Sequence, residues 1–246
     1  MKIHKLAEGP DHCWYVLGRD PEKMDTVIDT NECLIVGREE ALLCDPGGTE
    51  VFPQVVSTVS RIIAIEKIKC FLCSHQDPDV FSSLPLWMGL CPHARIYLSW
   101  LWAGFVAHYG HEYVEQFVKV PDQGQRIMLG RQELQLVPAH YLHSSGNFHL
   151  YDPELKILFS GDVGAALLPP SETDLFVRDF DAHVPNMEAF HRRWMPSNQA
   201  RDHWLARVRQ MEIRTMVPQH GSIFQGEDVG RFLDWFGALE LGSATA

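Results

Sequence analysis

The chain has 246 residues, of which 46% are hydrophobic and 22% are charged, so it can bury a core and is not a disordered protein. It carries 21 basic and 32 acidic residues, a formal net charge of −11, which argues against nucleic acid as a partner. No apolar run approaches the roughly 20 residues that span a bilayer, and the N-terminus lacks the pattern of a signal peptide. We therefore expect a cytoplasmic protein that binds neither nucleic acid nor membrane.

The first third of the chain is predicted to form short strands bounded by Gly, Pro, Asp or Asn. The expected strands are KIHKLA at 2–7, HCWYVLG at 12–18, ECLIVG at 32–37 and EALLCD at 40–45. Apolar residues at helical spacing predict a helix over 51–64, and a strand follows over 69–74. Cys70 and Cys73 form a CxxC in this strand. Without a second CxxC, we interpret them as small buried side chains.

The remaining two thirds mix helical and strand patterns. Helices are expected through 86–88, over 99–109, over 185–211 with a break at 195–198, and over 227–239; strands are expected at 94–98, 116–120, 126–129, 133–138, 147–151, 156–160 and 215–218. Asn198 is predicted to cap the second half of the long helical stretch, and residues from about 240 to 246 are predicted to fray. This order predicts an α+β fold of two packed sheets with helices outside, formed by residues 1–246 as a single domain.

Four segments place a His or an Asp directly after a predicted strand, where ligands of α/β sheets gather. They are His75-Gln76-Asp77-Pro78-Asp79, His140-Tyr141-Leu142-His143, Gly161-Asp162 and Gln219-His220-Gly221. In an extended loop, His75, Asp77 and Asp79 would point the same way. Their two carboxylates would repel each other unless a cation lay between them. Taken alone, the segment is equally consistent with an ordinary Asp-Pro-Asp turn.

Taken together and in this order, the four segments resemble the metallo-β-lactamase superfamily over nearly the whole chain. The superfamily motif, HxHxDH followed by His, Asp and His, corresponds here to His75, Asp77, Asp79, Val80, His143, Asp162 and His220. The CDPGG at 44–48 is similar to the early Asp-Gly turn of the superfamily. The resemblance implies a four-layer αββα sandwich with a dinuclear metal site at one edge of the two packed sheets.

Two departures from the motif favour one branch of the superfamily. Asp77 stands where most hydrolases have His; a carboxylate there is similar to the flavodiiron proteins, which usually have Glu, and to the related oxygen-binding di-iron proteins. Val80 stands where the family often has a His on the second metal, and Val cannot coordinate. The resemblance implies that metal one is held by His75, Asp77 and His143, that metal two is held by Asp79 and His220, and that Asp162 bridges them.

Imidazole and carboxylate donors without Cys suit iron or manganese, although zinc also fits, and we expect two iron ions that change between Fe²⁺ and Fe³⁺. His140 is a candidate to support the ligands from behind or to replace the missing His, and Tyr141 is the candidate pocket residue that contacts bound oxygen species. A stripe of aromatic residues at helical spacing is predicted to be core rather than pocket lining; it consists of Trp100, Trp102, Phe105 and Tyr109.

The resemblance implies a non-haem di-iron protein that binds O₂ and acts as an oxygen or redox sensor, with a peroxo form as one way of holding O₂. Flavodiiron proteins carry a fused flavodoxin-like domain, and the chain has no room for one, so we expect no FMN here and a separate signalling or electron-donor protein as partner. The alternatives are a reductase of O₂, NO or peroxide fed by such a donor, a zinc-dependent hydrolase of esters, thioesters or phosphodiesters, and a binding protein whose metal is structural or absent. The aromatic content is compatible with a homodimer.

Overall fold

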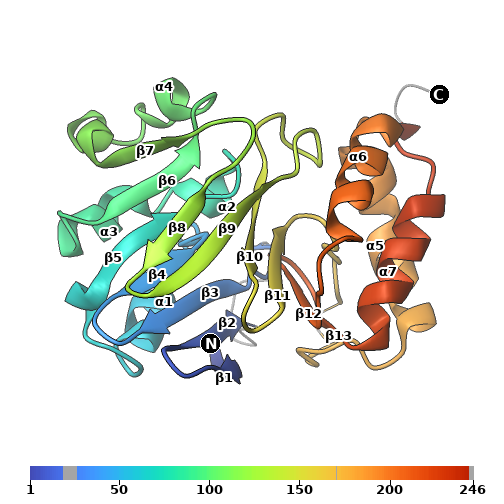
Figure 1. The fold of residues 1–246 in the computed structure, drawn as a ribbon, viewed down its shortest axis with the longest axis horizontal. Coiled ribbons are helices and arrows are strands. Elements are labelled where there is room, and N and C mark those ends of the chain that lie inside the picture. Colours follow the sequence, from blue (N-terminus) through green and yellow to red (C-terminus); the bar gives the residue numbers. More distant parts are fainter. Residues whose placement is uncertain (19–26, 170, 244–246) are drawn as a thin grey trace.

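The computed structural model describes residues 1–18, 27–169 and 171–243 (Figure 1). Its strands form two mixed sheets. The first sheet has seven strands in chain order: β1 (Lys2–Glu8), β2 (His12–Gly18), β3 (Glu32–Gly37), β4 (Ala41–Cys44), β5 (Ile68–Leu72), β6 (Arg95–Ser99) and β7 (Phe117–Val120). The second has six, in the order β13 (Phe224–Gln225), β12 (Thr215–Pro218), β11 (Ile157–Gly161), β10 (Phe148–Asp152), β9 (Gln132–Pro138) and β8 (Arg126–Leu129). Strands β4 to β7 run parallel to one another, and so do β11 and β12.

Helices connect the strands and lie outside the two sheets (Figure 1). Those of the described residues are α1 (Phe52–Val59), α2 (Pro78–Phe81), α3 (Leu84–Leu90), α4 (Ala103–Val106), α5 (Phe180–Trp194), α6 (Asn198–Val208) and α7 (Glu227–Ala238), with short 3₁₀ turns η1 (Ile65–Lys67) and η2 (His111–Gln116). None of these helices is both long enough and apolar enough to cross a membrane.

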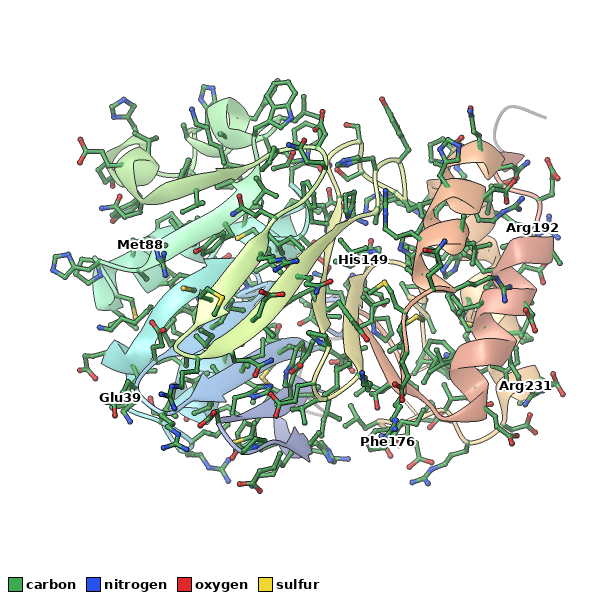
Figure 2. All side chains as sticks on the ribbon, viewed as in Figure 1. Glu39, Met88, His149, Phe176, Arg192 and Arg231 are labelled. Atoms are coloured by element: carbon green, nitrogen blue, oxygen red, sulfur yellow. The ribbon has the colours of Figure 1, made fainter. Side chains whose placement is uncertain are left out.

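Apolar side chains fill each space between the layers. Between the sheets, Trp14 and Cys70 meet Phe148 and Phe159 in one cluster. A second cluster joins α1 and α3 to the outer face of the first sheet, and a third joins α5, α6 and α7 to the outer face of the second. Figure 2 marks His149 in that third space, where its Nδ1 accepts a hydrogen bond of 3.1 Å from Trp204 Nε1. The predicted four-layer αββα sandwich is confirmed.

Side chains of one strand alternate between these clusters, which decides the interpretation of the CxxC. Cys70 belongs to the cluster between the sheets, whereas Cys73 belongs to the cluster under α1 and α3. The two thiols are buried and free, and they point to opposite faces of the sheet. The interpretation as small buried side chains is therefore confirmed.

Two helices are shorter than predicted, and the shorter second one leaves aromatic residues exposed that were expected in the core. The helix predicted over 51–64 ends at Val59. The one predicted over 99–109 is the four-residue α4, since residue 99 still belongs to β6 and the helix ends at Val106. With so little helix, side chains at helical spacing do not share one buried face. Trp100, Phe105 and Tyr109 are 51%, 66% and 41% exposed, so the prediction that they belong to the core is wrong. Trp102 alone of the stripe is half-buried and packs against the cluster under α1 and α3.

The helical stretch near the C-terminus also differs in its ends. Helix α5 begins at Phe180 because the Asp179 carboxylate accepts hydrogen bonds from the N–H groups of residues 181 and 182, and Pro185 lies inside the helix. The cap of α6 is Ser197, whose Oγ accepts from the N–H of residue 200 at 3.1 Å, so the prediction of Asn198 as the cap is wrong.

Instead of capping α6, Asn198 holds the C-terminal segment. Its Oδ1 accepts a hydrogen bond from the N–H of Leu241 at 3.0 Å, and its Nδ2 donates to Glu240 Oε1 at 2.7 Å. The N–H of Gly242 donates to the carbonyl of Met195, and Leu241 is buried. Residues 240–242 are therefore packed rather than frayed, while residues 244–246 lie outside the described part of the chain.

Candidate metal centre

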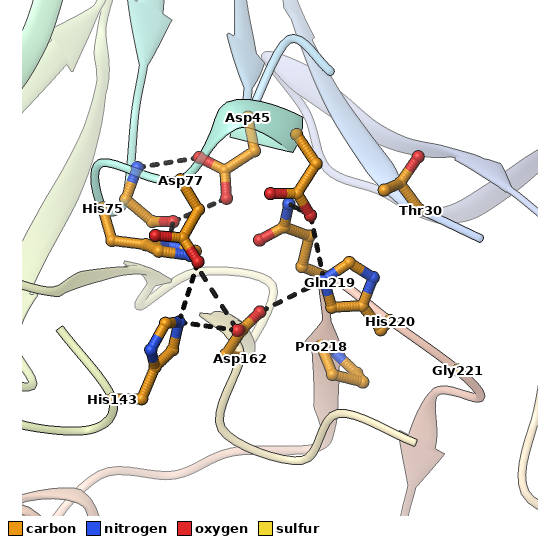
Figure 3. A network of polar contacts seen from close by, with 12 residues as sticks. Thr30, Asp45, His75, Asp77, His143, Asp162, Pro218, Gln219, His220 and Gly221 are labelled. Carbon is orange, nitrogen blue, oxygen red and sulfur yellow. Dashed lines mark hydrogen bonds and ion pairs between the residues drawn. The ribbon is translucent and has the colours of Figure 1, made fainter. Parts of the chain in front are cut away.

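The orientation of His75 is set by a chain of hydrogen bonds at the carboxyl ends of the parallel strands β4 and β5. The buried Asp45 carboxylate accepts from the Ser74 N–H at 2.8 Å and from Ser74 Oγ at 2.6 Å. Because the Ser74 hydroxyl gives its hydrogen to Asp45, it accepts from His75 Nδ1 at 2.8 Å. This leaves His75 Nε2 directed at the other predicted ligands (Figure 3).

Asp162 lies at the middle of these ligands, on the turn that follows β11. Positive φ angles at Gly161 and Gly164, 50° and 96°, permit the tight turn around it. Its two oxygens face different partners. Oδ2 lies 2.8 Å from His143 Nε2 and 3.9 Å from His75 Nε2, whereas Oδ1 lies 3.4 Å from His220 Nε2. This division is what a carboxylate bridging two metal ions requires.

The half of the site around Asp162 Oδ2 contains His75, His143 and Asp77. The Oδ2 of Asp77 lies 3.7 Å from His75 Nε2 and 3.5 Å from His143 Nε2. One ligand atom each from His75, His143 and Asp162 lie within 4.8 Å of one another. The spacing of these donors suits one metal ion.

The other half of the site contains His220 and Asp79, with Nε2 of His220 3.2 Å from Oδ2 of Asp79. His220 Nδ1 donates to the carbonyl of Asp29 at 2.9 Å, which fixes the ring with Nε2 inward. The amide of Asn31 donates to the carbonyls of Pro218 at 3.0 Å and Gly221 at 2.8 Å. These bonds hold the loop that carries His220 against the start of β3.

Burial and charge oppose each other throughout the site. Burial would lower the pKa of His75 and of His220, but Asp162 and the neighbouring Asp77 or Asp79 outweigh it and raise both pKa values to about 9. Burial would raise the pKa of Asp162, but His220, His75 and His143 hold it well below its usual range. The protein therefore keeps the buried Asp162 carboxylate ionised, because the surrounding imidazoles stabilise its negative charge and it stabilises their protonated forms.

The side chains at three further predicted positions form no hydrogen bond, ion pair or ring contact with the ligand side chains that the structure describes. Val80 is fully buried in the cluster under α1 and α3. His140 Nε2 donates to the carbonyl of Asp122 at 2.8 Å, and its ring packs edge-on against Phe148. Tyr141 is 55% exposed, so its side chain lies at the surface rather than in a closed pocket. Its contact with oxygen species stays a prediction, as does a role of His140 beside the ligands.

Several residues that hold the site were not identified as site residues from the sequence. Asp45, Ser74 and Asn31 position His75 and His220, and the Gln219 amide donates to Asp79 Oδ2 at 3.2 Å. Asp45 had a signal, because it stands in the CDPGG turn directly after a strand. For Asn31 there was none, since its partners lie nearly 190 positions away in the chain.

The buried polar atoms of the centre test whether a metal fits. Nε2 of His75, Nε2 of His143 and Oδ1 of Asp162 are buried, and apart from the ion-pair contacts within the site given above they form no hydrogen bond with the described residues. Such atoms are costly to leave unpaired, and all three point into the same space (Figure 3). Nitrogen and oxygen donors with no thiolate suit iron, manganese or zinc. The residues present therefore fit a metal centre.

Comparisons with known proteins point to one family and one fold. A family model described as "ODP family beta lactamase" matches residues 28–221. The structure titled "Peroxy diiron species of chemotaxis sensor ODP" is 38% identical, with 99% of this chain and 97% of that chain covered and a TM-score of 0.88. The apo state of the chemotaxis sensor ODP from T. denticola is 39% identical, with 98% and 96% covered and a TM-score of 0.88.

A more distant structure shares the fold. A mutant of the flavo di-iron protein from Thermotoga maritima is 18% identical, with 96% of this chain and 60% of that chain covered and a TM-score of 0.80. No curated protein matches the chain.

Proposed function

The chain belongs to the family described as "ODP family beta lactamase", and we propose that it is a non-haem di-iron protein that binds O₂ and serves as an oxygen or redox sensor. The observation that carries the proposal is the 38% identity, over 99% of the chain, to the protein titled as a chemotaxis sensor with a peroxy diiron species. The convergence of the predicted ligands on Asp162 supports it. We propose a signalling protein as the partner.

In this proposal each half of the site holds one iron. Metal one would be bound by His75, Asp77 and His143, and metal two by Asp79 and His220, with one oxygen of Asp162 on each. When bound, the two irons supply a site at which O₂ can be held and reduced. The protein's part is to keep the imidazoles aimed inward through Ser74 and through the carbonyl of Asp29.

The chain's own groups also determine how a small oxidant reaches the site. The side chains of His75, Asp162 and His143 are 1%, 5% and 8% exposed, whereas those of Asp77 and Asp79 are 29% and 38% exposed. The carboxylate side of the site therefore faces solvent, and the imidazole side is enclosed. A small molecule would enter past the two exposed carboxylates.

The test is to purify the protein without oxygen, measure its metals, and record its absorbance before and after O₂ is added. We expect about two irons per chain and a new absorption band that persists after O₂ uptake stops. Asp162→Asn should bind less iron and should not develop the band. Asp202→Asn, a change at an exposed position of α6, should keep the iron content and the band. Continuous O₂ consumption with an artificial electron donor would instead indicate a reductase. Zinc with an unchanged spectrum would refute the proposal and favour a hydrolase.

A further inference from the structure

Two of the three imidazoles of the site are oriented by hydrogen bonds, and the third is not. Nδ1 of His75 is fixed by Ser74, and Nδ1 of His220 by the carbonyl of Asp29. His143 Nδ1 forms no hydrogen bond with any residue that the structure describes. Because a metal-binding His is normally held through its second ring nitrogen, some other contact must orient His143.

That contact is made by aromatic rings on the last turn of α5. The ring of Trp194 meets the ring of His143 edge to face, with centroids 5.6 Å apart and planes at 84°. Phe190 meets the same imidazole at 6.3 Å and stacks on Trp194 at 5.9 Å. Perpendicular ring pairs at these distances are favourable and directional. The two rings therefore restrict the rotation of His143.

The same turn also holds the loop that carries Asp162. Nε2 of His191 accepts the N–H of Gly164 at 3.0 Å, and Nδ1 of His191 donates to the carbonyl of Met187 at 2.9 Å. His191 is fully buried, and burial lowers its pKa to about 4, so it stays neutral and keeps both bonds. The end of α5 thus contacts two of the three loops that carry donors of metal one, those of His143 and Asp162.

Trp194 is unusual because it is 55% exposed while its partner His143 is almost enclosed, with 8% of its side chain accessible. An exposed Trp makes little contribution to the core, so the stabilising contact of Trp194 that matters here is the one with His143. Arg192 of the same turn, marked in Figure 2, donates to the carbonyl of Glu240. This bond ties the end of α5, which carries Trp194, to the C-terminal segment.

We propose that Trp194 is the positioning residue of metal one: its ring holds and covers His143 in place of the missing hydrogen bond. This inference rests on the proposed function only in requiring that His143 binds a metal. It predicts that the aromatic ring, and not the indole N–H, is what matters. It also predicts that metal two, on the other side of Asp162, is affected less.

The test uses Co²⁺ as the probe, because its visible spectrum reports ligand geometry without O₂ chemistry. Metal-free full-length protein is titrated with Co²⁺ under nitrogen, and the metal is then withdrawn with a chelator. The variants are Trp194→Ala, Trp194→Phe and Phe190→Leu, with Trp100→Ala as matched control. Trp100 is 51% exposed, its Nε1 donates to the Asp122 carboxylate, and it has no ring contact with a predicted ligand among the described residues.

We expect Trp194→Ala to weaken the tighter Co²⁺ site by about tenfold or more, as outer contacts of metal ligands usually do, and to alter the spectrum. Trp194→Phe should restore both to near wild type, Phe190→Leu should give an intermediate loss, and Trp100→Ala should change nothing. Unchanged affinity and spectrum in both Trp194→Ala and Phe190→Leu would overturn the inference. Wild-type protein that binds no Co²⁺ would refute the metal site itself. Protein that binds Co²⁺ but, loaded with iron, ignores O₂ would refute the proposed function alone.

Discussion

Glu32 offers a prediction whose magnitude can be worked from the structure. It is the first residue of β3 and is completely buried. The hydroxyl of Thr30 donates to Oε1 at 2.7 Å, while Oε2 has no partner among the described residues. Burial raises the pKa of Glu32 to about 8, although the bonds from Thr30 and from the backbone oppose the rise. The folded protein therefore holds a neutral carboxyl at pH 7.

The sign of the pH dependence follows from where the proton binds more tightly. The carboxyl has a pKa of 4.5 when unfolded and about 8 when folded, so the stability is fully present below pH 4.5 and is lost as the pH rises towards 8. At 1.36 kcal/mol per pH unit the loss is about 3 kcal/mol at pH 7 and about 5 kcal/mol above pH 8. Glu32→Gln keeps an acceptor for Thr30 and cannot ionise. The difference in free energy of unfolding between Glu32→Gln and wild type should therefore shift in favour of the variant by these amounts, relative to the difference at low pH.

The assay is urea unfolding of metal-free protein at pH 5, 7 and 8.5. The free energy of unfolding of Glu32→Gln should rise relative to wild type as the pH increases, whereas Glu39→Gln, on the surface in Figure 2, should track wild type at each pH. A constant difference between Glu32→Gln and wild type across this range would refute the reasoning, because it would mean that Glu32 is already ionised in the folded protein.

Three further predictions follow from other contacts. Asp162→Asn should lower the bound metal, measured by elemental analysis, to about one ion per chain or fewer, because a neutral amide is a poor bridge between two metals. Val80→His should destabilise the metal-free protein by about 1–3 kcal/mol in urea unfolding, since Val80 is fully buried in the apolar cluster under α1 and α3; an unchanged free energy of unfolding would show that the position tolerates a polar ring. Asp152→Ala should cost about 3–5 kcal/mol in urea unfolding, because it removes the partner of His12 Nε2 at 2.5 Å and of Trp14 Nε1 at 2.7 Å; little or no loss would show that the pair is not stabilising.

The predicted ligands could be found in the sequence because each stands directly after an apolar strand. Strand ends of a sandwich meet at one edge, so the local pattern around His75 or Asp162 is enough to place it. The contacts that orient these ligands are different, because they join segments far apart. Trp194 is far along the chain from His143, and Asn31 is far from the loop of His220. No periodicity in a single sequence reveals such pairs.

The wrong predictions share a physical cause, which is that the extent of a short helix depends on single residues, such as a glycine or a cap, more than on the spacing of its apolar residues. Gly104 and Gly110 weaken a helix across the aromatic stripe, so α4 is short, and Trp100, Phe105 and Tyr109 are exposed. At the start of α6, Ser197 and Asn198 are both good caps. The extended backbone of Ser197 selects it, with ψ at 114°, and Asn198 is left to bind the C-terminal segment.

Val80 gives the two halves of the site different characters. In the proposed set, metal two has Asp79, His220 and one oxygen of Asp162, which leaves it coordination positions for water or O₂. Asp79 is also the most exposed of the predicted ligands at 38%, whereas His75 is almost completely enclosed. A chelator should therefore remove metal two first and metal one slowly, and the exchangeable metal should be the one at which O₂ binds. Simultaneous loss of both metals would show that Asp162 couples them too tightly for the halves to act separately.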